Sequence, residues 1–111
     1  MMHQDWEDLK RLAVTFQVAA KHDFSPQVLT AGKILRDEAK RRAPVRTGFL
    51  RSKITAKKAG KNGADVISAA PYAAYVEYGT SKMAPRSHMR PAIEATIDDM
   101  AAAIIEGVEI L

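Results

Sequence analysis

Residues 50–70 read LRSKITAKKAGKNGADVISAA, and this stretch decides the fold. From Leu50 to Lys57, apolar or small side chains alternate with polar ones, a period of two that predicts a half-buried strand with one basic face. Gly60-Lys61-Asn62-Gly63 supplies residues that tolerate positive φ, and Asp65 to Ala70 resumes an extended run, so we expect an antiparallel hairpin. Because a lone hairpin is marginally stable, its sheet should gain another strand from this chain or a neighbouring one.

Two helices are expected before the hairpin. Apolar side chains recur at spacings of three and four between Trp6 and Ala20, which predicts an amphipathic helix over Asp5 to Ala20. Ser25 and Pro26 suit the N-cap and first position of a second helix. Pro44 ends that helix, because proline disfavours helical geometry in the residue before it.

After the hairpin, Ala69 to Thr80 fits either a strand or a short helix, and we favour the helix. Ser81 to Arg90 has a proline and three cations and is typical of an exposed loop or arm. Pro91 can open a last helix with an apolar stripe from Ile93 to Val108. The expected fold is α+β, with helices packed on a small antiparallel β-sheet and an exposed hairpin and arm. We expect a single domain over residues 1–111, in which residues 1–24 form the first helix and its connection.

Composition excludes several classes of protein. Hydrophobic residues are 47% and charged residues 27% of the chain, which is ordinary for a soluble globular protein. The chain has no cysteine, so a disulfide framework and a thiolate metal site are excluded. Its start does not resemble a signal peptide, and its apolar runs fall short of the roughly 20 residues that cross a bilayer. We therefore expect no membrane contact.

Charge is distributed unevenly along the chain. The segment from Lys33 to Lys61 contains eleven basic residues and only two acidic ones, Asp37 and Glu38. Its net charge is therefore +9, whereas that of the whole chain is +4. The remainder is therefore acidic, above all in the last helix. Such a split suits a polyanion or the acidic side of a neighbouring copy, although a solvated basic face is the alternative.

The sequence shows no constellation for catalysis. His3, His22 and His88 lie in dissimilar contexts and are expected at the surface, and none accompanies a recognisable nucleophile. No ligand spacing predicts a metal site, and Gly79 to Lys82 matches a phosphate loop only weakly. We expect no catalytic, cofactor-binding or metal-binding residues, and no enzyme.

Two segments are better explained by backbone geometry. Ala43 to Gly48 stops a helix at Pro44 and turns at Gly48, which forms a corner together with Thr47. In Tyr72 to Thr80 three tyrosines and a valine surround Glu77, so this carboxylate should be partly buried. Buried carboxylates are usually paired, and Arg46 or Arg51 is the expected partner.

Together these segments resemble the HK97 gp10-like family of phage tail components. The family pattern joins Ala-Pro-x-x-Thr-Gly-x-Leu to a later Tyr-Ala-x-x-Val-Glu-x-Gly-Thr and a Pro-Ala helix start. These marks stand at Ala43–Leu50, Tyr72–Thr80 and Met89–Ala92, and the resemblance covers about Val28 to Val108. The second mark is carried by Tyr72, Ala73, Val76, Glu77, Gly79 and Thr80.

The chain departs from the family pattern in two places. Members commonly carry a proline and an aromatic near positions 87 and 88, where this chain has Ser87 and His88. Many members also place an acid at the position of Arg46. These departures bear on how the arm docks and on what the corner contacts.

The resemblance implies a structural virion protein, a neck or tail-completion component assembled in the host bacterial cytoplasm. Copies would form a homo-oligomeric ring, with six-fold symmetry expected, at the head-tail junction or the tail end. The ring would contact neighbouring neck or tail proteins, and DNA would pass through its lumen. The residues expected to contact a neighbouring copy or DNA are Arg46, Arg51, Lys53, Lys57, Lys58, Lys82, Arg86 and Arg90.

The alternative function is that of a stand-alone small basic nucleic-acid-binding protein. A sequence pI of about 9.5 is compatible with it. Against it, the aromatics are not interleaved with the cations as a base-stacking platform requires. A small hydrolase is a more distant third possibility, because no candidate nucleophile is evident.

Overall fold

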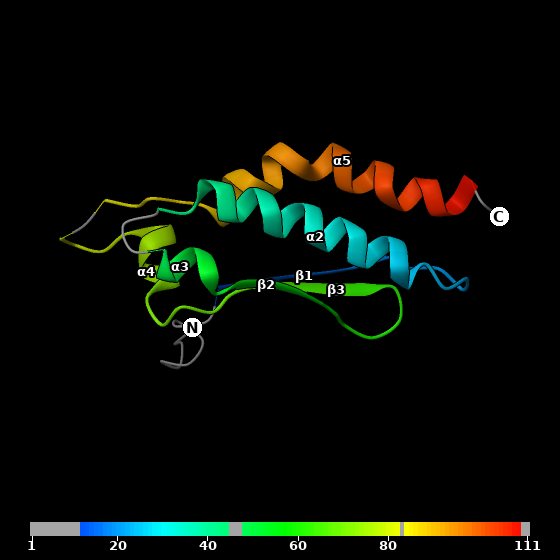
Figure 1. Cartoon of the computed structure of the whole chain (residues 1–111), viewed down its shortest axis with the longest axis horizontal. Coiled ribbons are helices and arrows are strands. Elements are labelled where there is room, and N and C mark those ends of the chain that lie inside the picture. The colour runs from blue at the N-terminus through cyan, green and yellow to red at the C-terminus, as the bar shows by residue number, and fades with distance from the viewer. Residues whose placement is uncertain (1–11, 45–47, 83, 110–111) are drawn as a thin grey trace.

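The computed structural model describes residues 12–44, 48–82 and 84–109, which form an α+β fold (Figure 1). Helix α5 packs on α2, and α2 packs in turn on a three-stranded antiparallel sheet with strand order β1-β3-β2. The α+β class expected from the sequence is confirmed. In chain order the elements are β1 (Leu12–Gln17), α2 (Ser25–Arg42), α3 (Phe49–Ser52), β2 (Ile54–Lys58), β3 (Gly63–Ser68), α4 (Ala73–Tyr78) and α5 (Met89–Glu109).

The predicted hairpin is present as β2 and β3. Ile54 lies opposite Ser68 and Lys58 lies opposite Ala64, and within β2 the buried Ile54 alternates with the exposed Thr55. The strand begins at Ile54, so its predicted start at Leu50 is wrong. Leu50 is instead buried within the short helix α3. The sequence could not separate the two, because one apolar side chain followed by polar ones fits a helical turn as well as a strand.

The third strand is β1, where the spacing of apolar residues predicted a helix. β1 pairs antiparallel with β3 from Leu12 opposite Ser68 to Gln17 opposite Gly63. The predicted helix is therefore wrong over residues 12–20, and residues 5–11 lie outside the described residues. Leu12, Val14 and Phe16 also satisfy a period of two, and the open edge of β3 offers backbone partners that an isolated segment lacks. Tertiary pairing thus decided between two periods that the sequence allowed.

Helix α2 is the central layer of the molecule. Val28, Ala31, Leu35 and Ala39 on α2 have no exposed surface. Gly32 allows close approach to the sheet, since a Cβ built there would lie 3.2 Å from the Cβ of Ala64. The helix ends at Arg42, before Pro44, as predicted.

The start of α2 is tied to the tip of the hairpin through Asn62. The Asn62 side chain accepts a hydrogen bond from the Phe24 N–H (2.5 Å) and donates to the carbonyls of Ala20 and His22. The Asn62 N–H donates to the Ser25 hydroxyl. Ser25 is the first helical residue and Phe24 is the N-cap, so the predicted N-cap role of Ser25 is wrong. Asn62 has a φ of 59° and is 1% exposed. It therefore combines the turn conformation with buried polar contacts.

Helix α5 begins at Met89, two residues before Pro91. Met100 of the predicted apolar stripe is buried and Ile93 and Ile104 are half-buried, whereas Ile97 is 55% exposed. Ile97 is therefore not enclosed as the predicted stripe requires, because it lines an open groove together with Val14 and Phe16 of β1. Among the described residues, no helix has both the length and the apolar character needed to cross a membrane.

We expect Asn62→Gly to lower the free energy of unfolding by about 2 kcal/mol, because the buried Phe24 N–H and the partly buried carbonyls of Ala20 and His22 lose their partner. Asn62→Ala should cost about 1 kcal/mol more, because a Cβ is strained at positive φ. Urea unfolding of both variants separates the hydrogen bonds from the backbone conformation. A glycine variant as stable as the parent would show that these hydrogen bonds contribute nothing.

Candidate functional site

The family-motif segment Tyr72–Thr80 holds the start of α5 through one carboxylate. Glu77, on α4, is 3% exposed. Its Oε1 accepts hydrogen bonds from the backbone N–H groups of His88 and Met89, each at 2.9 Å, and its Oε2 accepts one from Arg90 at 3.1 Å. These N–H groups have no partner within the helix, and the helix dipole favours a negative charge there. We call this arrangement the Glu77 cap.

Two further contacts hold the arm against α4. The Arg86 N–H donates to the Val76 carbonyl at 2.7 Å, and the Ser87 hydroxyl donates to the Glu77 carbonyl at 2.7 Å. The described arm residues before His88 are exposed, as predicted. Its last residues are thus fixed by α4.

Of the two arginines expected as its partner, only Arg51 can be compared with the structure, and it is not the partner of Glu77. Arg51 does not contact it, and its Nε donates instead to the Lys40 carbonyl at 3.0 Å. Arg46 lies outside the described residues. No local sequence rule pairs a carboxylate with a helix that starts twelve residues later, although the acid among tyrosines did indicate burial.

His88 was expected at the surface and is fully buried instead. Its Nε2 lies 3.0 Å from the Ser68 hydroxyl. Its Nδ1 lies 3.2 Å from Glu77 Oε1, although the geometry there is not that of a hydrogen bond. The sequence carries no local signal for this cluster, because Ser68 on β3 and His88 at the start of α5 are twenty residues apart.

Ser68, His88 and Glu77 stand in the order of a serine-type catalytic triad. Ser68 and His88 have no exposed surface, so a substrate has no access to the hydroxyl in this conformation. The carboxylate is also occupied by three backbone N–H groups. The arrangement therefore serves to pack β3, α4 and α5 together.

Both titratable groups of this cluster have a lowered pKa. Burial by itself raises the pKa of Glu77. The hydrogen bonds from the backbone N–H groups of Met89, His88 and Arg90, together with the nearby His88 ring, outweigh burial and leave the pKa of Glu77 below its ordinary value. Burial lowers the pKa of His88, and this outweighs the opposing effects of Glu77 and the Arg86 backbone. At neutral pH the cluster therefore holds an ionised Glu77 beside a neutral His88.

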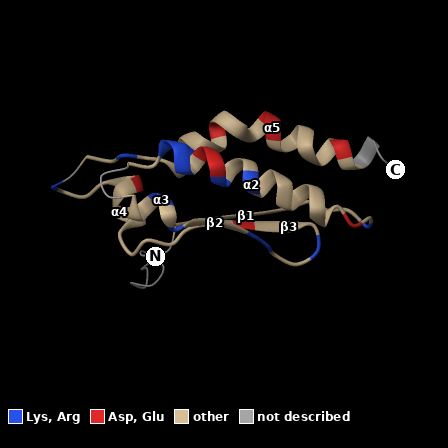
Figure 2. Cartoon of the chain, in the orientation of Figure 1, with Lys and Arg blue, Asp and Glu red and all other residues tan. Residues whose placement is uncertain are grey.

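The cations expected to make contacts do not form one surface. Lys57 and Lys58 are exposed on β2, and Lys82, Arg86 and Arg90 are exposed on the arm and at the start of α5. Lys53 is exposed beside α3, where its Nζ lies 5.4 Å from the centre of the Phe49 ring. Figure 2 shows basic residues on the hairpin and at the end formed by α3 and the arm, and acidic residues along α5.

At the corner, Gly48 has a φ of 79° and precedes α3, as the predicted turn requires. Thr47 lies outside the described residues. The described chain contains no group of three or more His, Asp or Glu side chains that could hold a metal ion.

The model of the HK97-gp10-like family, described as "Bacteriophage HK97-gp10, putative tail-component", matches residues 8–79, more than half of the chain. The chain belongs to the HK97-gp10-like family. It is accordingly a bacteriophage tail component. The match runs from the segment that contains β1 to Gly79, so it includes the corner and all of the tyrosine mark except Thr80. It begins before the expected Val28 and ends before the third mark at Met89–Ala92, so it does not bear out the expected extent to Val108. No curated protein and no solved structure matches the chain.

In this HK97-gp10-like tail component, Glu77→Ala should lower the free energy of unfolding by about 3 kcal/mol or more, because three buried N–H groups lose their acceptor. Glu77→Gln keeps one acceptor oxygen and should cost about half as much. Glu94→Gln, at an exposed site on α5, is the matched control and should change stability by less than about 0.5 kcal/mol. Equal effects of Glu77→Ala and Glu94→Gln in chemical unfolding would contradict the role of the cap.

The lowered pKa values predict loss of stability in acid. Each group binds its proton more weakly in the folded chain than in the unfolded chain, so the unfolding free energy decreases as pH falls. The contribution of His88 is complete above its ordinary pKa of 6.5 and is lost as pH falls through its folded-state pKa. That of Glu77 is complete above 4.5 and is lost at still lower pH.

His88→Gln should remove the part of this decrease that begins near pH 6.5 and keep the part below 4.5. Urea unfolding of both proteins from about pH 8 to about pH 4 measures the two parts. Parallel pH profiles of parent and variant would show that His88 does not titrate with folding.

Proposed function

We propose that this tail component is a neck or tail-completion protein whose copies assemble into a ring at the head-tail junction or the tail end of the virion. Membership of the HK97-gp10-like family carries the proposal. In this role the protein works by assembly and catalyses no reaction. Its partners are other copies of itself and the adjoining neck or tail proteins, and six-fold symmetry would suit a ring around the tail axis.

The distribution of charge supports contacts between copies. From Ile93 to Gly107, α5 carries Glu94, Asp98, Asp99 and Glu106 and no basic residue. The opposite charges gather on the hairpin and at the end formed by α3 and the arm (Figure 2). Because these regions are separate on one chain, a basic region of one copy can meet α5 of the next, which is a heterologous contact of the kind that closes rings.

Nucleic-acid binding is the second candidate, and one observation favours it. The Phe49 and Tyr72 rings are 43% and 40% exposed, with centroids 6.2 Å apart, and Lys53 lies beside Phe49. Exposed rings beside a cation offer stacking surface for bases. DNA in a ring lumen would use the same chemistry with phosphate contacts from Lys57 and Lys58.

Salt dependence separates DNA binding from contacts between copies. If the cations bind phosphates, DNA affinity should fall linearly with the logarithm of salt concentration, by a slope of about 0.9 per neutralised phosphate. Fluorescence anisotropy with labelled duplex and single-stranded DNA measures this slope. If the double substitution Lys57→Ala and Lys58→Ala lowers this slope, these cations bind DNA. If the parent protein has no measurable affinity for DNA, the cations are assigned to contacts between proteins.

We expect deletion of the gene from the parent phage or prophage to leave filled heads apart from tails, or tails of aberrant length. Electron microscopy of the lysate, with joined particles, free heads and free tails counted, measures this outcome and shows which end the protein serves. Complementation from a plasmid is the control. Normal infectious particles in the deletion strain would overturn the proposed role and favour the nucleic-acid-binding alternative.

A further inference from the structure

The large apolar side chains that the described residues leave exposed lie on two separate surfaces. Phe49, Tyr72 and Tyr78 are 43%, 40% and 65% exposed and lie on α3, at the start of α4 and at its end. Ile97 and Ile105 on α5 are 55% and 53% exposed. Figure 1 shows α3 and α4 at one end of the molecule, while α5 runs away from it. We call the first surface the aromatic end.

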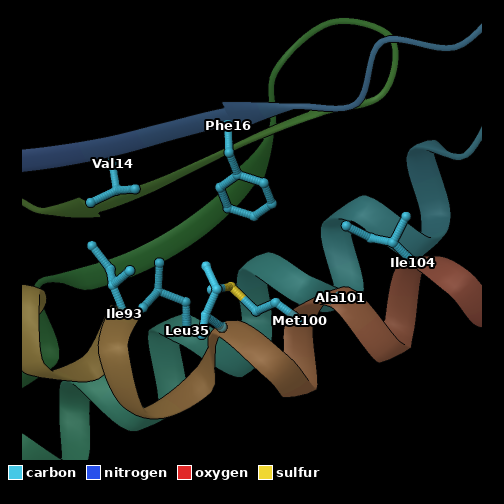
Figure 3. A pocket seen from close by; sticks show the side chains of 8 residues that line it. Val14, Phe16, Leu35, Ile93, Met100, Ala101 and Ile104 are labelled. Atoms are coloured by element: carbon cyan, nitrogen blue, oxygen red, sulfur yellow. The ribbon is translucent and has the colours of Figure 1, made fainter.

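The second surface continues into an apolar groove between β1, α2 and α5 (Figure 3). The groove has a volume of about 260 Å³. Phe16 points from β1 towards the helices, across from Met100. Ile97, Ala101 and Ile105 recur every four residues beside the groove, so they form one exposed stripe along α5. We call the groove and this stripe the α5 groove.

An open apolar groove of this kind on a small protein is costly to leave in water and marks a site of association. It is bordered by the exposed acids Glu94 and Asp98, which lie on the same side of α5 as the stripe by helical spacing. The aromatic end carries the opposite charge, since Lys53 lies beside Phe49, and Arg90 lines the same hollow as Tyr78. The two surfaces therefore match both in apolar character and in charge.

We infer that the aromatic end of one copy docks in the α5 groove of the next copy. Tyr78 is the best-placed anchor, because it is the most exposed of the three rings and tyrosine combines a large apolar body with a polar tip. Lys82 and Arg90 would then meet Asp98 and Glu94 at the rim. This inference rests on the proposed function, since it names the surfaces through which the copies join.

The contact is heterologous, because it uses two different surfaces of the same chain. Each copy therefore offers one free aromatic end and one free groove until rotation closes the ring. A two-fold dimer would instead bury the same surface of both partners. This difference makes the inference testable with pairs of single variants.

Cysteine cross-linking tests the contact directly, because the chain has no cysteine of its own. Ser81→Cys, which leaves the Tyr78 ring in place, and Ala101→Cys are made separately, distinguished by a size tag, mixed after nuclease treatment and exposed to a mild oxidant. We expect the mixed disulfide to form at least about tenfold faster than in the control pair of Ser81→Cys with Thr55→Cys, because only docked residues are held together. Thr55 is an exposed residue on β2. A rate no higher than that of the control pair would overturn the inference.

A second substitution separates docking from chance collision. Ile97→Asp in the Ala101→Cys chain should return cross-linking to the control rate, because docking would bury a carboxylate in an apolar groove. Ile97 is more than half exposed, so the variant should keep the urea-unfolding midpoint of its parent, which shows that it folds. The inference fails if cross-linking persists in this variant.

Two other possible occupants of the α5 groove would give different cross-linking results. If deletion of residues 2–11 were required before any cross-link formed, the groove would be filled by the chain's own N-terminal segment and the inference would be wrong. Loss of the cross-link together with unjoined heads and tails in the deletion phage would leave the proposed function standing and would assign the groove to another tail protein. A specific cross-link, together with normal infectious particles in the deletion phage, would overturn the proposed function but not the contact between copies.

Discussion

The Glu77 carboxylate, which caps three consecutive backbone N–H groups at the start of α5, is the interaction on which the rest of the structure depends. It fixes where α5 begins, and through Arg86 and Ser87 it holds the end of the arm against α4. Buried N–H groups without an acceptor are costly, so the Glu77 carboxylate stabilises this helix start by accepting from all three. The buried His88 and Ser68 extend the same cluster to the sheet.

This cap has a direct consequence for function. It holds the start of α5 against the family-motif segment, and from there α5 packs on α2 and leaves an open groove towards β1. The groove between these elements stays open and apolar, whereas the end of the molecule beside the cap carries exposed tyrosines and cations. A bacteriophage tail component built in this way has two unlike surfaces on one small chain. Ser68 and His88, by contrast, are enclosed and contribute to neither surface.

Much of the fold was predictable because it follows from local rules. The hairpin, the end of α2 before Pro44 and the short helix α4 were each expected from turn residues, proline geometry or spacing, and the structure confirms them. β1 was predicted as a helix, because Leu12 to Gln17 satisfies both periods and only the open edge of β3 selects the strand. The burial of Glu77 was expected, but its partner was not, since the cap joins residues ten or more positions apart.

The sequence by itself determined the α+β class, the hairpin and the family, because turn chemistry, hydrophobic period and the spacing of short motifs are properties of neighbouring residues. Only the tertiary structure decided which acid caps which helix, that His88 is enclosed and that Ile97 lines an open groove. These outcomes depend on how α4, α5 and the sheet meet, which is a matter of packing between distant segments. The two candidate docking surfaces arise at the same level, since each combines residues from elements that the chain brings together only on folding.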